Sequence, residues 1–261
     1  MAGAGSGVLS VMNMKKRVLA FVCAIVLCIG IMPAFAFAAG GGIVVTYQPS
    51  VFDVGQCYNI VWVTDVNAVA YVEYEYNGTL YRVYDQQSGV VRTDDNIHVV
   101  SVQKEHLDNN TYTAYAVRVE SVSAYGIEYG NTVACEPVYF KGYHGQEQFN
   151  IFSLSDIHAD TGVAEQTADM LEGEPDMLVL LGDINSYLQT ESDFTNYVLD
   201  AARRLTDGSI PILYTRGNHE TRGAYAPYII PYFRSYTGQM YFQTDYGPIS
   251  IAVLDTGEDK V

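Results

Sequence analysis

The sequence predicts an all-β sandwich followed by an α/β domain with a parallel sheet. From residue 43 to 139, apolar and polar side chains alternate, and turn-forming residues interrupt the pattern at 86–89, 94–96 and 108–110. From residue 149 onward, apolar runs alternate with stretches of helical periodicity. Short, closely spaced strands are typical of a sandwich, whereas strand–helix–strand order implies parallel strands joined by crossovers.

The first region is expected to hold six clearly marked strands, at residues 58–63, 70–76, 79–84, 99–102, 112–119 and 133–140. Asn77-Gly78 is a strong hairpin signal between two of them. The many tyrosines suit half-buried pleated surfaces, so we attribute them to sheet packing rather than carbohydrate binding. We therefore assign the sandwich to residues 43–140 and a polar linker to 141–148.

The second region, residues 149–261, is expected to alternate strands and helices. Its apolar runs predict strands at residues 149–154, 177–181, 210–214, 240–243 and 249–254. Val163, Thr167 and Met170 recur at helical spacing. Thr190 and Asp193 form a capping pattern before a second helix. Continuous apolar strands indicate a sheet that is covered on both faces.

The N-terminus has the composition of a signal peptide, which we assign to residues 1–39. Lys15-Lys16-Arg17 precedes an apolar stretch at 18–32, and small residues follow at 34–39. The protein is therefore expected to be secreted or displayed at the cell surface, without a stable membrane span after cleavage. The alternative is a membrane anchor formed by an uncleaved signal.

The formal net charge of −16 argues against a nucleic-acid partner, because an acidic surface repels phosphate backbones. It would also repel a phosphorylated substrate unless metal ions invert the local field. Cys57 and Cys135 are the two cysteines beyond the signal region. In an exported protein they either form a disulfide or remain as buried thiols, and the sequence leaves both possibilities open.

Polar motifs follow three of the predicted parallel strands. They are Asp156-Ile157-His158, Gly182-Asp183, and the run of residues 217–220, Gly-Asn-His-Glu. Ligands of open α/β sheets gather at the carboxyl ends of strands, so these motifs should meet. Carboxylate, amide and imidazole groups at one edge could hold two divalent ions that clamp a phosphoryl oxygen.

In this order the motifs resemble those of the calcineurin-like metallophosphoesterases. The preceding fibronectin-III-like sandwich is similar to the arrangement in purple acid phosphatases. The resemblance implies hydrolysis of a small phosphorylated substrate by a dinuclear site of Mn, Zn, Fe or Mg. It assigns one metal to Asp156 and His158, a bridging role to Asp183 and the second metal to Asn218. His219 would be catalytic beside the phosphate, and Glu220 would lie behind the ligands.

The chain departs from the family pattern in two ways. None of its five histidines follows His219, so the family's late histidine ligands are missing. We interpret the catalytic domain as C-terminally incomplete, with weak metal binding and poor turnover. Ser186 occupies the position of the purple-type tyrosine, with Tyr187 one residue later, which argues against an Fe(III)–tyrosinate centre.

Two other functional hypotheses remain at this point. One is a non-catalytic exported β-sandwich module attached to an incomplete hydrolase domain. The other is a phosphodiesterase of the same superfamily. Arg216 and Arg222 flank the third motif, and each could approach a phosphate or form a structural ion pair. Asp255 ends the last predicted strand and is a weaker candidate for the site.

Overall fold

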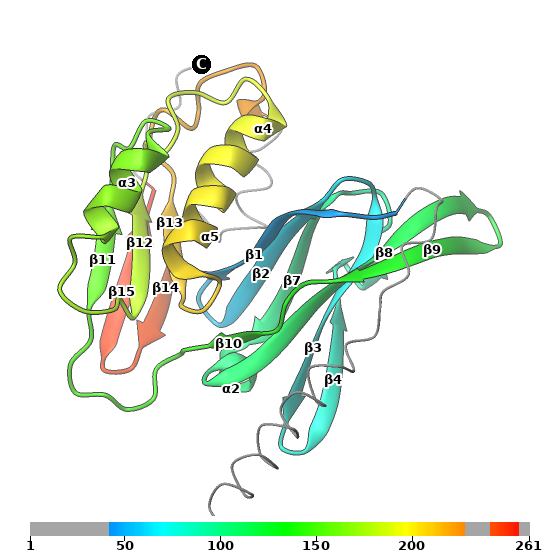
Figure 1. Ribbon diagram of the computed structural model, residues 1–261, viewed down its shortest axis with the longest axis horizontal. Coiled ribbons are helices and arrows are strands. Elements are labelled where there is room, and N and C mark those ends of the chain that lie inside the picture. The colour runs from blue at the N-terminus through cyan, green and yellow to red at the C-terminus, as the bar shows by residue number, and fades with distance from the viewer. Residues whose placement is uncertain (1–41, 228–240, 256–261) are drawn as a thin grey trace, which may run out of the picture. The chain divides into compact units, whose positions relative to one another are not determined.

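The computed structural model describes residues 42–227 and 241–255 (Figure 1). The predicted signal peptide, residues 1–39, lies outside the described residues. The chain from Ile43 onward forms one compact unit. Within the described ranges, no helix is long and apolar enough to cross a membrane.

A mixed six-stranded sheet has the order β11-β12-β13-β1-β2-β7. These strands are β11 (Ile151–Leu154), β12 (Met177–Leu181), β13 (Ile212–Thr215), β1 (Val45–Asp53), β2 (Cys57–Thr64) and β7 (Ile97–Gln103). β11, β12 and β13 run parallel, which confirms the predicted parallel arrangement. β1 also runs parallel to β13, with Phe52 opposite Ile212. The predicted sandwich region and the predicted α/β region therefore share one sheet.

A second sheet packs against the β1-β2-β7 part of the first. It has the order β10-β8-β3-β4, and β9 also pairs with β8. Its strands are β3 (Ala68–Tyr76), β4 (Thr79–Tyr84), β8 (Asn110–Ser123), β9 (Gly126–Ala134) and β10 (Val138–Phe140). The single strand predicted at 133–140 is wrong, because Pro137 separates β9 from β10. A proline cannot donate a ladder hydrogen bond.

Strands β1 and β2 are buried on both faces. Ile60 and Trp62 point into the core between the two sheets, together with Val72 and Val100. Val61 and Val63 belong to a different core, on the helix-covered face. Two-sided burial explains the nearly continuous apolar run at residues 58–63, which a one-sided strand would not need.

The parallel strands are covered by helices on one face and by a hairpin on the other (Figure 1). The helical elements are α3 (Thr161–Ala168), α4 (Glu191–Phe194), the π-helical turn η1 (Thr195–Leu199) and α5 (Asp200–Thr206). The predicted cap is confirmed, since the Asp193 carboxylate accepts the Thr190 N–H at 2.8 Å. The hairpin consists of β14 (Tyr241–Tyr246) and β15 (Ile249–Leu254).

Short elements and the connecting segment complete the fold. Sequence patterns did not indicate α2 (Lys104–Leu107), β5 (Gln86–Gln87) or β6 (Val90–Val91). The predicted linker at 141–148 has no regular structure, but it is packed against the hairpin. Tyr143 and Phe149 each make an edge-on ring contact with Tyr246, at centroid distances of 5.7 and 5.6 Å.

Both cysteines of the described region are free thiols. Cys135 is buried in the core between the sheets, and burial raises the pKa of its thiol to about 12. Cys57 is partly exposed, and Gln103 Nε2 donates to its sulfur at 3.4 Å. The structure therefore has two free thiols and no disulfide between them, although only Cys135 is buried as the thiol alternative expected.

His98 is a fully buried histidine inside the core between the sheets. It lies opposite Trp62, with ring centroids 5.4 Å apart, and its Nε2 is 2.7 Å from Thr64 Oγ1. Burial lowers its pKa from 6.5 to about 3, and the nearby Arg92 adds to the shift. The ring is therefore neutral in the folded protein across the mildly acidic range.

We expect His98 to make the fold acid-sensitive. The unfolded chain takes up a proton near pH 6.5 and the folded chain does not. Stability is therefore complete above that pH and falls as the pH drops towards 3. Between pH 7 and pH 5, wild type should lose about 2 kcal/mol of unfolding free energy relative to His98→Gln. Urea unfolding at both pH values measures this. His144→Gln, an exposed control, should follow wild type, and equal losses in H98Q and wild type would contradict the prediction.

Candidate metal centre

The candidate site is formed by the loops that follow β11, β12 and β13. The first two loops are joined by backbone hydrogen bonds that continue beyond their strands. Asp156 N donates to Gly182 O at 3.2 Å, and His158 N donates to Asp183 O at 3.0 Å. This pairing places the first two motifs side by side, as their positions at strand ends predicted.

Three potential ligand residues adopt left-handed backbone conformations. Asp156, His158 and Asp183 have φ values of 55°, 50° and 51°, and Ala159 between the motifs has φ 70°. Such conformations cost of order 1–3 kcal/mol each in non-glycine residues and cluster at functional sites. Strain in the motifs themselves indicates that the fold holds these side chains in positions that local preference does not favour.

The second and third loops touch through two glycines. A Cβ atom on Gly182 would lie 2.4 Å from Gly217 N, closer than real Cβ contacts allow. Gly182 also has a φ of 80°. The two backbones can therefore approach only because both positions lack side chains, and this approach brings Asp183 next to His219.

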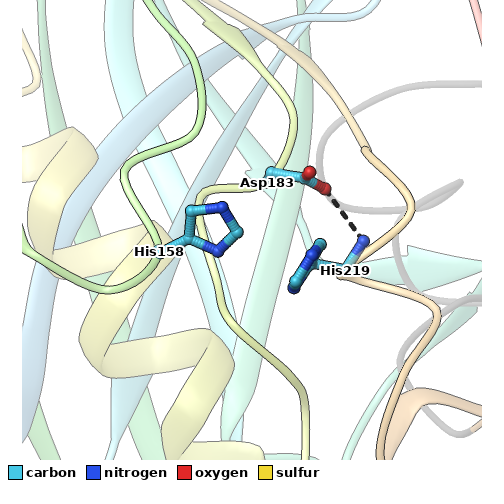
Figure 2. A group of neighbouring side chains, drawn as sticks. All are labelled: His158, Asp183 and His219. Carbon is cyan, nitrogen blue, oxygen red and sulfur yellow. Dashed lines mark hydrogen bonds between the residues drawn. The ribbon is translucent and has the colours of Figure 1, made fainter.

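Figure 2 shows the group that results, made of His158, Asp183 and His219. Each offers a ligand atom, and the three atoms lie within 4.8 Å of one another. Asp183 Oδ1 accepts the His219 backbone N–H at 2.8 Å, and the two imidazole rings are 4.4 Å apart. The Asp156 carboxylate is 3.9 Å from His158 Nε2 and is mostly exposed. The structure thus brings these four predicted residues together.

The Asn218 amide faces the Asp183 carboxylate, and two orientations of the amide are available. In one, its nitrogen donates to Asp183 Oδ2 at 3.1 Å and its oxygen accepts from Arg222. In the other, its oxygen faces only acceptors, including the carboxylate. That second orientation also turns the amide nitrogen towards donors only, so the first orientation is the one that satisfies the amide. Coordination of a divalent ion by Asn218 would require the amide to turn its oxygen towards Asp183. The carboxylate and imidazole groups of the cluster are by themselves a donor set that fits a divalent metal.

The two histidines of the cluster differ in how their ring nitrogens are used. His219 Nδ1 is 2.8 Å from the Ser186 carbonyl oxygen, and its Nε2 is 2.7 Å from Arg222 Nη1. Arg222 Nη1 also lies 3.2 Å from His219 Nδ1, so both ring nitrogens of His219 are already close to protein groups. His158 makes no ring hydrogen bond to any other described residue beyond its 3.9 Å approach to Asp156. His158 is therefore the better placed of the two to coordinate a metal.

Glu220 connects the loops from behind the cluster and is completely buried. Its Oε1 accepts the N–H groups of Ile184 and Asn185, at 2.7 and 3.2 Å. Its Oε2 accepts those of Gly217 and Asp183, at 2.7 and 3.0 Å. Burial raises its pKa above the usual value, while hydrogen bonds from the N–H groups of Asn185, Gly217 and Asp183 oppose that shift. The position of Glu220 in the third motif marked it as a candidate site residue. Nothing in the sequence indicated that its carboxylate would accept these four hydrogen bonds.

The remaining candidates have structural partners. Ser186 donates its hydroxyl to the His158 carbonyl oxygen at 3.0 Å, while Tyr187 is exposed. Asp255 is buried and forms an ion pair with Arg216, which also is buried. His106 lies among tyrosine rings, and His144 lies beside Gly142 in the connecting segment. Of the chain's five histidines, all within the described residues, two reach the site.

A parallel sheet with carboxylate, amide and imidazole groups at its carboxyl edge is typical of metal-dependent hydrolases. Residues 149–258 match the sequence model of the calcineurin-like phosphoesterase family. The matched stretch contains all three loops, and it supports placing this part of the chain in that superfamily. A search of curated proteins found no match.

Proposed function

We propose that this protein hydrolyses phosphate monoesters at a site that holds two divalent metal ions. The observation that carries this proposal is the cluster of His158, Asp183 and His219 at the carboxyl ends of three parallel strands. The family match supports metal-dependent phosphoester hydrolysis in general. The dinuclear character, the monoester substrate and the ion, which would be Mn, Zn, Fe or Mg, belong to the proposal.

Each residue has a distinct part in this proposal. Asp156 and His158 would hold one ion, Asp183 would be a ligand shared by both ions, and Asn218 would offer its amide oxygen to the second. Divalent ions at such sites act as Lewis acids on phosphoryl oxygens and lower the pKa of a bound water. His219 would lie beside the phosphoryl group, because contacts with the Ser186 carbonyl oxygen and with Arg222 hold its ring next to Asp183. The imidazole assists proton transfer to the leaving oxygen.

The rest of the chain suggests where this chemistry takes place. We propose that residues 1–39 direct export, and that residues 43–140 form a fibronectin-III-like sandwich comparable to that of purple acid phosphatases. The face-to-face packing of the two sheets around Trp62 supports a sandwich. The boundaries at 43–140, 141–148 and 149–261 remain our proposed division, although β1 and β13 pair across it.

We expect the purified full chain to hydrolyse p-nitrophenyl phosphate only when a divalent metal is added. The test compares Mn²⁺, Zn²⁺ and Mg²⁺ with metal-free protein, using release of p-nitrophenol. Faster hydrolysis of bis-p-nitrophenyl phosphate would instead favour the phosphodiesterase hypothesis. Metal binding without hydrolysis of either ester would favour the non-catalytic module.

A further inference from the structure

Two arginines flank the third motif, and the structure gives them different roles. Arg216 is 8% exposed, and its Nε pairs with the buried carboxylate of Asp255. This pair ties the end of β13 to the end of β15. The charge of Arg216 is therefore already balanced inside the protein, which makes it a structural residue rather than one that meets a substrate.

Arg222 is partly buried and points at the candidate metal centre. Its Nη1 lies 2.7 Å from His219 Nε2, and its Nη2 lies beside the Asn218 amide oxygen in one amide orientation. Within residues 42–227 and 241–255, no ion pair joins Arg222 to a carboxylate. Among the described residues its partners are therefore neutral groups, and its charge lies at the place where the substrate is proposed to bind.

The backbone at Arg222 is held firmly against the loop that follows β12. Leu188 N donates to Arg222 O at 2.7 Å, and Arg222 N donates to His219 O at 3.1 Å. A Cβ atom on the next residue, Gly223, would lie 2.2 Å from Leu188 O. The guanidinium is therefore carried by an anchored turn, which limits the entropy lost when it binds a ligand.

We propose that Arg222 binds the non-bridging oxygens of the substrate phosphoryl group. A planar guanidinium offers paired N–H donors that match two phosphate oxygens, and it remains charged at all relevant pH values. In a strongly acidic protein it also supplies local positive charge beside the ions. This inference rests on the proposed function, because it places the phosphoryl group at the metal cluster.

The test measures binding of inorganic phosphate to Mn²⁺-loaded protein by calorimetry, in wild type, Arg222→Gln and Arg222→Lys. Loss of charge-assisted hydrogen bonds should weaken phosphate affinity about 10- to 100-fold in R222Q, and R222K should recover part of it. Mn²⁺ affinity should stay close to that of wild type. Arg204→Gln removes an equal charge from an exposed arginine paired with Glu165 and Asp200, and should change neither affinity.

The outcomes separate this inference from the proposed function. Wild-type phosphate affinity in folded, Mn²⁺-loaded R222Q would overturn the role of Arg222 and leave the proposed function standing. A lower kcat with unchanged phosphate affinity would also overturn it, and would indicate that Arg222 only orients His219. Wild-type protein that binds neither Mn²⁺ nor phosphate would overturn both. Melting temperatures of R222Q and R222K establish that each variant is folded.

Discussion

Replacing Asp183 by asparagine is expected to weaken Mn²⁺ binding by more than about 100-fold, since it removes the central charged ligand of the cluster. The fold should tolerate the change. Asn can adopt the φ of 51° found at this position, and its amide oxygen can still accept the His219 backbone N–H. Calorimetric titration of metal-free protein with Mn²⁺ measures the affinity. Metal-dependent hydrolysis of p-nitrophenyl phosphate should disappear in parallel.

Asp207→Asn is a matched control for this variant. Asp207 also has a φ of 51°, but it is exposed and pairs only with Arg203 on the helix surface among the described residues. It should bind Mn²⁺ like wild type. A second readout is thermal unfolding, because a ligand at 100 times its Kd stabilises a protein by about 2.7 kcal/mol. Mn²⁺ should raise the melting temperature of wild type and D207N but not that of D183N. Equal stabilisation of all three would contradict a metal site at Asp183.

Replacing Glu220 by glutamine is expected to cost about 3 kcal/mol of folding stability. The substitution keeps the shape but exchanges one carboxylate oxygen for an NH₂ group. That NH₂ group would face the backbone N–H groups of Asp183 and Gly217, which would no longer have an acceptor. Because the Glu220 side chain is completely buried, water could not replace the lost acceptor. For a domain of this size the melting temperature should fall by about 10 °C.

Loss of the Glu220 acceptors should also loosen the metal site. The same carboxylate holds Asp183, in the second motif, and Gly217, in the third. We expect a 10- to 100-fold loss of Mn²⁺ affinity, the size typical when a residue that orients ligands is removed. Glu174→Gln is the control, because Glu174 is exposed and pairs with Lys141 on the surface. If E220Q and E174Q melted and bound Mn²⁺ alike, the four hydrogen bonds would have no role in stability or in the site.

Much of the α/β region could be predicted because its signals are local. Apolar runs at 177–181 and 210–214 match buried parallel strands, and Thr190 with Asp193 forms the expected cap. The motif residues Asp156, His158, Asp183 and Asn218 were found for the same reason. A polar group placed directly after an apolar strand is visible in the sequence, and strand ends of a parallel sheet meet at one edge.

Other features depended on partners that are distant in the chain. The sequence contained both arginines of the third loop but could not distinguish them, because Asp255 approaches Arg216 only when β15 packs beside β13. The pairing of β1 with β13 could not be predicted either, because the apolar pattern of each strand is compatible with any apolar neighbouring strand. Likewise, the sequence did not determine whether Cys57 and Cys135 form a disulfide, and the structure leaves both as free thiols.

The sequence by itself determined the type of the longer elements, the order of the motifs and the chemical groups available for metal binding, since these follow from residue type and spacing. Only the tertiary structure decided how the groups are held. Glu220 is an ordinary glutamate in sequence, and becomes the acceptor for four N–H groups because burial removes water as a competing partner. Arg222 faces the metal centre because its backbone is bonded to Leu188 and His219, while Arg216 is turned to the buried Asp255. The periodicity of apolar residues indicates which side chains are buried. Which groups those side chains contact depends on how the elements pack in the tertiary structure.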